Sequence, residues 1–567
     1  MKTVLALVRG GAERKVQQDG TNVPSVDSFG TMVSNYNWYL TACRLHKSIG
    51  IGWNAMTSRT QFAIGCLCLL ALDQHCGSVA LAQETSAAAG SDGSAGWASR
   101  KLSEKVLARR GSDPSFSIDF ARYQRELNDL PIGVFDSGVG GLTVLETLLG
   151  FDQHNNSNAQ PGSDGIPDFQ NEKFVYLGDQ ANMPYGNYSS VGKEDFLREL
   201  IIKDAIFLLG NRYWKSLLVA TPSFDKPPVK AIVIACNTAT AYGLADIRAA
   251  LELWALPVLV VGVVEAGADS FVQELPAFGA PAAVAVMATA GTCSSGAYPK
   301  AIRKAAGLAG KRLPTVWQQG SIGLAGAIEG NSSFVRVGAK DAEAGEQPSD
   351  YQGPSIDNAK APIDISLSSA YGFELAGLAG IEENPITWRL NSVENYVRYE
   401  VTTMMEGYRK SGATEPIGKV ILGCTHFPFE SKRILENLSR LRDYRDTEGQ
   451  QPYRELISDQ VELIDPGQLT AKQLYRQLLQ TRQLIRGNAK AEPKVMQIYL
   501  SVPGPAVQSM DRTLDGGFTS EFKYGRTAGE SEVDDTRIIP LTRKLLPSSL
   551  IELLSKKCPN VWGSIDD

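Results

Sequence analysis

The chain has 567 residues, of which 43% are hydrophobic and 21% charged. These fractions are typical of soluble globular proteins and exclude a wholly disordered, collagen-like or coiled-coil chain, and the length allows about three to five domains. The 56 basic and 62 acidic residues give a net charge of -6, which argues against a nucleic-acid-binding protein with a basic surface. Eight cysteines are too few for a disulfide scaffold, and four histidines argue against a histidine-rich metal site.

The N-terminal region contains a candidate targeting segment. Residues 1–55 show no sustained period and are interpreted as a mis-called extension, with the true start at Met56. The sequence that follows has a positive residue, Arg59, an uncharged apolar run over 62–72, and a small-x-small site, Ala80-Leu81-Ala82. Residues 56–82 are therefore predicted to be a secretory signal peptide, with a short buried helix as the alternative. The run is too short to span a membrane, and residues 83–129, rich in Gly, Ser and Ala at their start, are predicted to be a linker.

From Pro131 onward, short apolar runs end in small polar residues and are followed by helical patterns. Five such runs occur: IGVFDSGVGGLTVLETLL, FVYLGDQANMPYGN, AIVIACNTATAYGLADIRAAL, PAAVAVMATAGTCSSGAYPKAI and KVILGCTHFPFESKRIL. Fully apolar runs such as AIVIA suit parallel strands that are buried on both faces. Strands alternating with helices predict a three-layer α/β fold with parallel sheets. Ligands bind beyond the carboxyl ends of such strands, so the polar residues there are expected to converge on one cleft.

The predicted strand ends carry side chains suited to acid–base chemistry. In chain order they are Asp136-Ser137, Pro184-Tyr185-Gly186, Cys236-Asn237-Thr238, Thr289 with Thr292, and Cys424-Thr425-His426. A helix N-terminus after each cysteine would lower the pKa of the thiol toward the thiolate. Backbone N–H groups at the same ends can hold a carboxylate, and the hydroxyl and amide side chains can bind the charged groups of an amino acid.

Simpler interpretations of these residues stay open from the sequence alone. A cysteine after an apolar strand is often a small buried filler, and Asp136-Ser137 is compatible with an ordinary turn. A zinc site built from Cys236, Cys424 and His426 is conceivable, although no C-x-x-C pair accompanies it. The glycine run after Ser137 lacks the spacing of a dinucleotide fingerprint and has no P-loop lysine. The residues therefore favour neither a metal site nor a dinucleotide or P-loop phosphate site.

Five motifs carry a resemblance to a known family. FDSGVGGLTVL, LGDQANMPYGN, ACNTA, ATAGTCSSGAY and LGCTHFP, in this order, resemble glutamate racemases of the cofactor-independent aspartate/glutamate racemase superfamily. The similarity covers roughly residues 130–330 and 395–525. It implies two pseudo-symmetric three-layer αβα domains with a cleft between them. It also implies racemisation of L-glutamate to D-glutamate, which supplies peptidoglycan synthesis.

The resemblance further implies a two-base transfer of the α-proton by cysteines on opposite faces of the substrate. Carried over, Cys236 acts on D-glutamate and Cys424 on L-glutamate, and Asp136 and His426 assist the two thiols. Glu329 in GLAGAIEGN is the candidate counterpart of a family glutamate. The residues implied to bind substrate are Asp136, Ser137, Pro184, Tyr185, Gly186, Asn237, Thr238, Thr289, Thr292, Thr425 and His426.

The motif positions divide the chain into segments. A first α/β domain is predicted over 130–245 and a second over 246–485, with an insertion at 331–394. The chain is predicted to return to the first domain over 486–525 and to end in an extension over 526–567, part of which is amphipathic enough for a packed helix.

Partners, location and rival functions follow from the same resemblance. The expected partner is glutamate, with no nucleic acid and no stable membrane insertion, and a homodimer is compatible with the family. The family works in the cytoplasm, whereas the predicted signal peptide would direct export to the periplasm, so both locations stay open. Racemisation of another amino acid such as aspartate, and binding of an acidic amino acid without turnover, are the alternative functions.

Overall fold

The computed structural model describes residues 96–110, 118–275, 283–331, 333–335, 351–381, 387–486, 496–513, 517–530, 535–546 and 548–567. The predicted extension over 1–55 and the predicted signal peptide over 56–82 lie outside these residues. The described residues belong to one compact unit, which begins at Gly93. Within this part of the chain, no helix combines the length and the apolar character needed to cross a bilayer.

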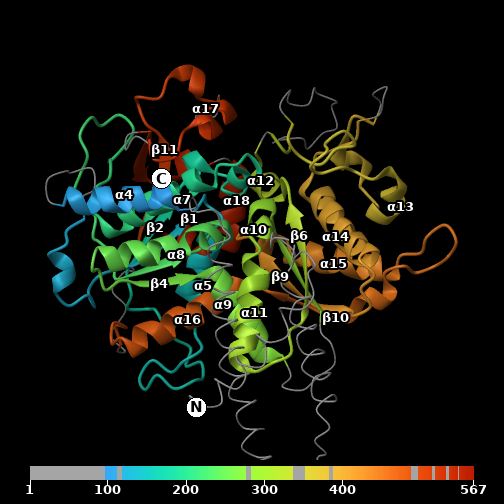
Figure 1. Cartoon of the computed structure of the whole chain (residues 1–567), viewed down its shortest axis with the longest axis horizontal. Coiled ribbons are helices and arrows are strands. Elements are labelled where there is room, and N and C mark those ends of the chain that lie inside the picture. Colours follow the sequence, from blue (N-terminus) through green and yellow to red (C-terminus); the bar gives the residue numbers. More distant parts are fainter. Residues whose placement is uncertain are drawn as a thin grey trace, which may run out of the picture. The chain divides into compact units, whose positions relative to one another are not determined.

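Six strands form the first sheet, in the order β12-β11-β2-β1-β3-β4 (Figure 1). Neighbouring strands are parallel except for the antiparallel pair β11 and β12. The first three predicted strands are confirmed as β1, β2 and β3, which are buried along their whole length. The bounds are β1 Ile132–Asp136, β2 Phe174–Gly178, β3 Ala231–Ile234, β4 Leu259–Gly262, β11 Met496–Pro503 and β12 Thr536–Pro540.

Four parallel strands form the second sheet, in the order β10-β9-β5-β6. The fourth and fifth predicted strands are confirmed as β5 and β9. A short antiparallel pair, β7 and β8, lies within the predicted insertion. The bounds are β5 Ala283–Thr289, β6 Thr315–Ser321, β7 Leu378–Ala379, β8 Arg389–Leu390, β9 Ile417–Gly423 and β10 Ile457–Ile464.

Helices follow most of the strands, as the alternating pattern predicts. The bounds are α4 Trp97–Ala108, α5 Leu142–Gly150, α6 Gly186–Ser190, α7 Glu194–Leu209, α8 Asn237–Leu253, α9 Val263–Glu274, α10 Ala290–Ser294, α11 Ala297–Ala309, α12 Leu324–Glu329, α13 Ser368–Tyr371, α14 Val393–Lys410, α15 Ser431–Asp443, α16 Pro466–Gln480, α17 Ser520–Gly525, α18 Ser548–Lys557 and α19 Pro559–Trp562.

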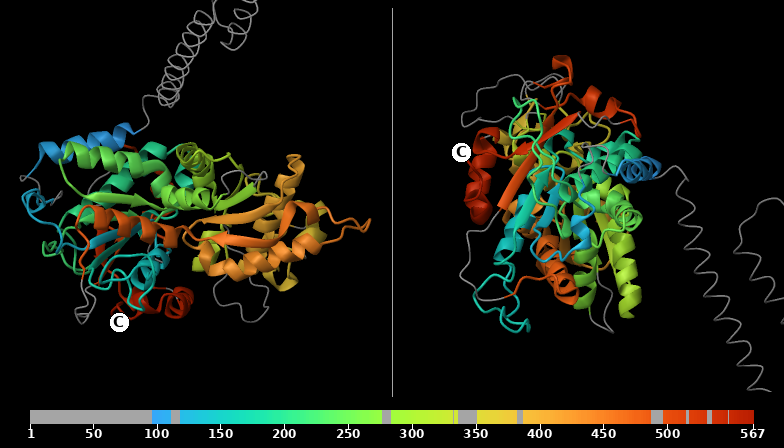
Figure 2. Two further views of the ribbon diagram at one scale, coloured as in Figure 1. Left: turned by 90° about the horizontal axis from the view of Figure 1, so that it is seen from below. Right: turned by 90° about the vertical axis from the view of Figure 1, so that its left-hand side faces the viewer.

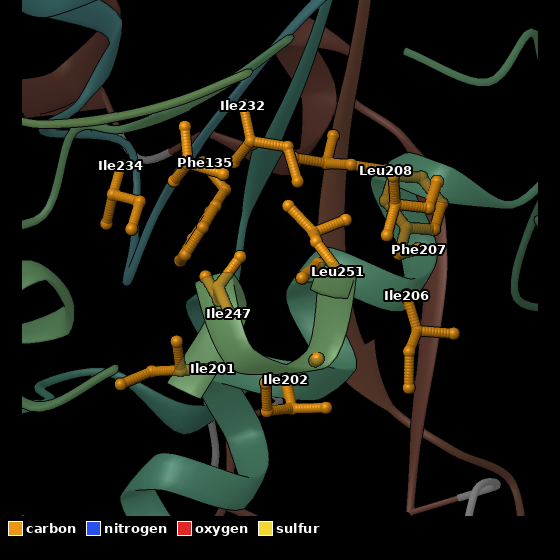
Figure 3. Close-up of a cluster of buried hydrophobic side chains, with 14 of the residues drawn as sticks. Phe135, Ile201, Ile202, Ile206, Phe207, Leu208, Ile232, Ile234, Ile247 and Leu251 are labelled. Carbon is orange, nitrogen blue, oxygen red and sulfur yellow. The ribbon is translucent and has the colours of Figure 1, made fainter. Parts of the chain in front are cut away.

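Helices cover both faces of the first sheet because side chains alternate along each strand. Phe135 of β1 and Ile232 of β3 pack with Ile201 of α7 and Ile247 of α8 on one face (Figure 3). On the other face, Val134 of β1 belongs to a cluster with residues of α5 and α16. The first sheet is therefore the middle of three layers, which is the arrangement predicted from its apolar strands.

The second sheet is layered in the same way. Ala285 and Met287 of β5 belong to a cluster with side chains of α12, α14 and α15. Val284 and Val286, the alternate residues of the same strand, pack with side chains of α9 and α11 on the opposite face. The predicted α/β class, with parallel sheets between helical layers, is confirmed for both sheets.

Three segments differ from the predicted organisation. Strand β4 lies in the predicted second domain over 246–485 but belongs to the first sheet, because it pairs with β3. Residues 97–108 form helix α4 in place of part of the predicted linker over 83–129, because Ala98, Leu102 and Val106 make a buried stripe at four-residue spacing. The predicted extension over 526–567 contributes β12 to the first sheet, and its helix α19 contacts α5. Figure 2 shows the C-terminal helices in red beside the label C. Helix α4 packs against α7 and α8, and β12 extends the first sheet, so both segments belong to the packed fold.

Candidate active site

The first group of site residues lies where β1 and β3 end. Asp136 is buried, and the N–H of Gly141 donates a hydrogen bond to its Oδ2 at 2.8 Å. Cys236 lies at the N-cap of α8, where its Sγ accepts from the N–H of Ala239 at 3.4 Å. The Cys236 thiol also donates to Ser137 Oγ at 3.7 Å. Asp136, Ser137 and Cys236 are thus brought together as the strand pattern predicts.

Burial sets the protonation of this group. Burial raises the pKa of Asp136, although the nearby His426 opposes the shift. Burial and then the negative charge of Asp136 raise the pKa of the Cys236 thiol well above its usual range. The expectation that the helix N-terminus lowers the pKa of this thiol is therefore wrong for Cys236, because loss of hydration outweighs the helix dipole. Cys236 rests as a neutral thiol.

The second group lies where β9 ends. The Cys424 Sγ and His426 Nδ1 are 3.7 Å apart, and His426 Nε2 lies 2.6 Å from Glu329 Oε1 at the end of α12. All three side chains are buried. Burial alone would lower the pKa of His426, but the Glu329 carboxylate and Cys424 together raise it well above its usual value. His426 is accordingly held between Glu329 and Cys424, which both favour its protonated form.

Glycines in the turn after β1 let the two groups approach each other. A Cβ atom built at Gly140 would lie 2.3 Å from His426 Cε1. One built at Gly138 would overlap Met183 Sδ at 2.6 Å and would make an ordinary contact with Glu329 Oε1 at 3.5 Å. Thr143 Oγ1 just beyond this turn donates to the carbonyl oxygen of Thr425 at 3.2 Å. Only glycine lacks the atom that would fill this space. Asp136 and Cys236 therefore lie on one side of the turn, at the ends of strands of the first sheet. His426 and Glu329, which follow β9 and end α12, contact the turn from the other domain layer.

Three predicted substrate-binding hydroxyls form a cluster across the two sheets. Thr238 of α8 lies 3.0 Å from both Thr289 and Thr292, which follow β5 and are themselves 3.0 Å apart. Asn237 Oδ1 accepts from Tyr298 at 2.6 Å, which fixes the orientation of the amide. These hydroxyl groups can each turn to donate to a carboxylate or accept from an ammonium group.

The second predicted loop, Pro184-Tyr185-Gly186, reaches this cluster with its backbone. A Cβ atom at Gly186 would lie 3.0 Å from Thr289 Oγ1. The Tyr185 hydroxyl lies 2.6 Å from Asp179 and 2.7 Å from Asp204. Asp204 was not singled out from the sequence, because an acidic residue inside a helix usually faces solvent and no motif marks it.

Within the described residues, no three or more His, Cys, Asp or Glu side chains are grouped so that they could hold a metal ion. In the structure Cys424 contacts His426, whereas Cys236 contacts Ser137. Each cysteine therefore has its own partners in a separate group.

Comparisons with known proteins identify relatives of part of the chain. No family model matches. A stretch of 176 residues is 32% identical to a glutamate racemase of Pediococcus pentosaceus and covers 31% of this chain and 49% of the relative. A glutamate racemase of Enterococcus faecalis is 35% identical over 179 residues, which is 32% of this chain and 49% of the relative. One of Gloeothece citriformis is 33% identical over 210 residues, or 37% and 56% of the two chains.

Solved structures of glutamate racemases are also similar, at lower identity. An enzyme isoform of Bacillus anthracis aligns with a TM-score of 0.35 and 21% identity over 63% of this chain and 84% of that one. The enzyme of Francisella tularensis, in complex with D-glutamate, aligns with a TM-score of 0.36 and 21% identity over 70% of this chain and 95% of that one. The chain spans about half the length of the curated relatives it matches. Over that stretch the predicted resemblance is confirmed, and the matched part of this chain is similar in sequence to glutamate racemases.

Proposed function

We propose that this chain is an amino-acid racemase that interconverts L- and D-glutamate by two-base transfer of the α-proton, without a cofactor. The observation that carries the proposal is the pair of separate thiols, each with its own polar partners. Cys236 has Asp136 and Ser137, and Cys424 has His426 and Glu329. The sequence relatives, which are named glutamate racemases, support the choice of reaction and of substrate.

The proposed proton transfer uses the different environments of the two thiols. For L-glutamate, the Cys424 thiolate removes the α-proton, and the neutral Cys236 thiol delivers its proton to the opposite face of the carbon. The electron pair of the broken C–H bond forms the new one, and Cys236 is left as the thiolate. Cationic His426 stabilises the negative charge at Cys424 before the transfer, and D-glutamate reacts by the same steps in reverse.

Binding of the substrate is assigned to the hydroxyl cluster and to backbone donors beside it. Thr238, Thr289 and Thr292 offer hydroxyl groups, and Asn237 offers an amide at the start of α8. Fixed donors next to the α-carboxylate are needed because the charge that develops during proton removal spreads onto that group. The D-glutamate formed would serve as a precursor of peptidoglycan.

A chiral assay of the purified, reduced full-length chain tests this function. We expect L-glutamate to be converted to a mixture of both enantiomers, with slower or no conversion of L-aspartate. Conversion of aspartate in preference to glutamate would overturn the substrate assignment. Calorimetric binding of glutamate without any conversion would overturn the racemase proposal in favour of a binding protein.

A further inference from the structure

One hydroxyl group lies between two buried carboxyl groups beside the proposed site. The Tyr185 oxygen is 2.6 Å from Asp179 Oδ2 and 2.7 Å from Asp204 Oδ2. A tyrosine hydroxyl carries one proton and can donate it to one of these oxygens. The other short contact needs a proton of its own, because two oxygens without a proton between them repel each other. One of the two carboxyl groups is therefore protonated.

The surroundings of the two carboxyl groups decide which one holds the proton. Asp179 accepts from Ser501 Oγ at 2.6 Å and from Asn182 Nδ2 at 2.9 and 3.0 Å, so both of its oxygens already have donors other than Tyr185. Asp204 is buried, and burial followed by the negative charge of Asp179 raises its pKa well above its usual range.

Other charged groups also face this pair. Lys203, the preceding residue on α7, lowers the pKa of Asp204, whereas the charge of Asp136 raises it. Both effects on this pKa are smaller than those of burial and Asp179. Arg526 donates to Asn182 Oδ1 at 2.5 Å on the far side of Asp179. The balance leaves a proton on Asp204 and the negative charge on Asp179.

We infer that Asp204 is a protonated positioning residue, which donates to Tyr185 and so holds the Pro184–Gly186 turn against the second sheet. The turn makes a close contact there: a Cβ atom at Gly291 would lie 2.6 Å from the Gly186 carbonyl oxygen. The same turn meets Thr289 of the hydroxyl cluster. Asp204 thus acts on the substrate site through Tyr185, an effect that rests on the proposed racemase function.

Two variants separate positioning from simple packing. Asp204→Asn keeps the size and supplies an amide donor, so KM and kcat are expected to stay within about twofold of the wild type. Asp204→Leu keeps the size without a donor, so KM is expected to rise about tenfold with little change in kcat. Equal effects of the two variants on KM would contradict the positioning role.

The second measurement is independent of any enzymatic activity. If folded Asp204 holds a proton that the unfolded chain loses above about pH 4, the unfolding equilibrium constant of the wild type rises about tenfold per pH unit relative to Asp204→Asn. Urea unfolding of both full-length proteins at pH 5.5, 6.5 and 7.5 measures this ratio. A constant ratio would overturn the inference even if racemisation is observed, and a rising ratio supports it even if racemisation is absent.

Glu406→Gln is the matched control for this experiment. Glu406 is also buried, which by itself would raise its pKa. Hydrogen bonds from Arg409 at 2.8 Å, from Tyr453 and from Lys410 together outweigh burial and hold the pKa below the usual range. Its carboxylate is ionised in both states above pH 5.5. We therefore expect a constant wild-type-to-variant ratio across the same pH range, and a ratio that rises here as well would show that the Asp204 result is not specific.

Discussion

His426 is the residue whose chemistry depends most on partners far away in the sequence. It lies two positions from Cys424, so one motif predicts that pair, whereas Glu329 is 97 positions distant. The sequence around Glu329 resembles the family only weakly, and its role could not be derived from spacing. The fold brings it to 2.6 Å from the imidazole because α12 ends beside the strand end of β9.

The charge on His426 makes stability depend on pH. A histidine whose pKa is raised by folding stabilises the fold fully below its unfolded pKa of about 6.5, and this contribution is lost as the pH rises toward the folded value. Relative to His426→Gln, the free energy of unfolding of the wild type is expected to fall by up to about 1.4 kcal/mol per pH unit above pH 6.5. Urea unfolding of both proteins between pH 5.5 and 8.5 checks this. A difference that does not change with pH would mean that folding does not shift the pKa of His426.

The two cysteines are expected to be required individually. Cys236→Ser and Cys424→Ser should each lower kcat/KM for racemisation by about 10²- to 10⁴-fold, because each removes one proton-transfer group. Cys293→Ser is the control, since Cys293 lies in α10 outside both thiol groups and is partly exposed. Chiral assays of the three variants decide the matter. Near-normal activity of either active-site variant would contradict the two-base assignment.

The turn between β1 and α5 is the element on which the site depends most. The sequence alone does not explain its glycines, because glycine-rich turns after strands serve many purposes. The structure gives the physical reason for Gly140, which is the approach of the His426 ring. Strand ends could be predicted from apolar runs, but the partner across the turn belongs to the other sheet and leaves no local pattern.

Gly140→Ala tests this turn. The added methyl group would overlap the imidazole at 2.3 Å, so His426 must move, and we expect a loss of racemisation of at least about tenfold with moderate destabilisation. Gly150→Ala is the matched control in the following helix, where nothing lies within 4 Å of the new atom. That variant should retain activity, and its free energy of unfolding should rise by up to about 1 kcal/mol. Full activity of Gly140→Ala would show that the close approach is not needed.

At the scale of the whole molecule, the C-terminal residues complete the first sheet. An amphipathic helix was predicted there, but the sequence does not state which surface it covers. In the structure, Leu550, Leu554, Val561 and Ile565 are buried against the face that also holds α5. Glu146 of α5 accepts hydrogen bonds from the backbone of Val561 at 2.9 Å and of Asn560 at 3.2 Å. Long-range packing of this kind follows from the assembled sheet and could not be derived from local spacing.

Removal of residues 548–567 is therefore expected to unfold the first sheet. Each buried aliphatic side chain contributes about 1.5–3 kcal/mol, so four of them approach the whole stability of a typical domain, about 5–15 kcal/mol. Circular dichroism and urea unfolding of the truncated chain measure the loss. A truncated protein with an unchanged unfolding midpoint would contradict the assignment of these residues to the core.

Exchange of the α-proton with solvent tests the central claim most directly. Reduced full-length protein is incubated with L-glutamate, and separately with D-glutamate, in deuterium oxide without added cofactor, and the α-proton signal is followed by NMR. The two-thiol site predicts loss of that signal and appearance of the deuterated opposite enantiomer from either starting material. Retention of the α-proton in both substrates would contradict it.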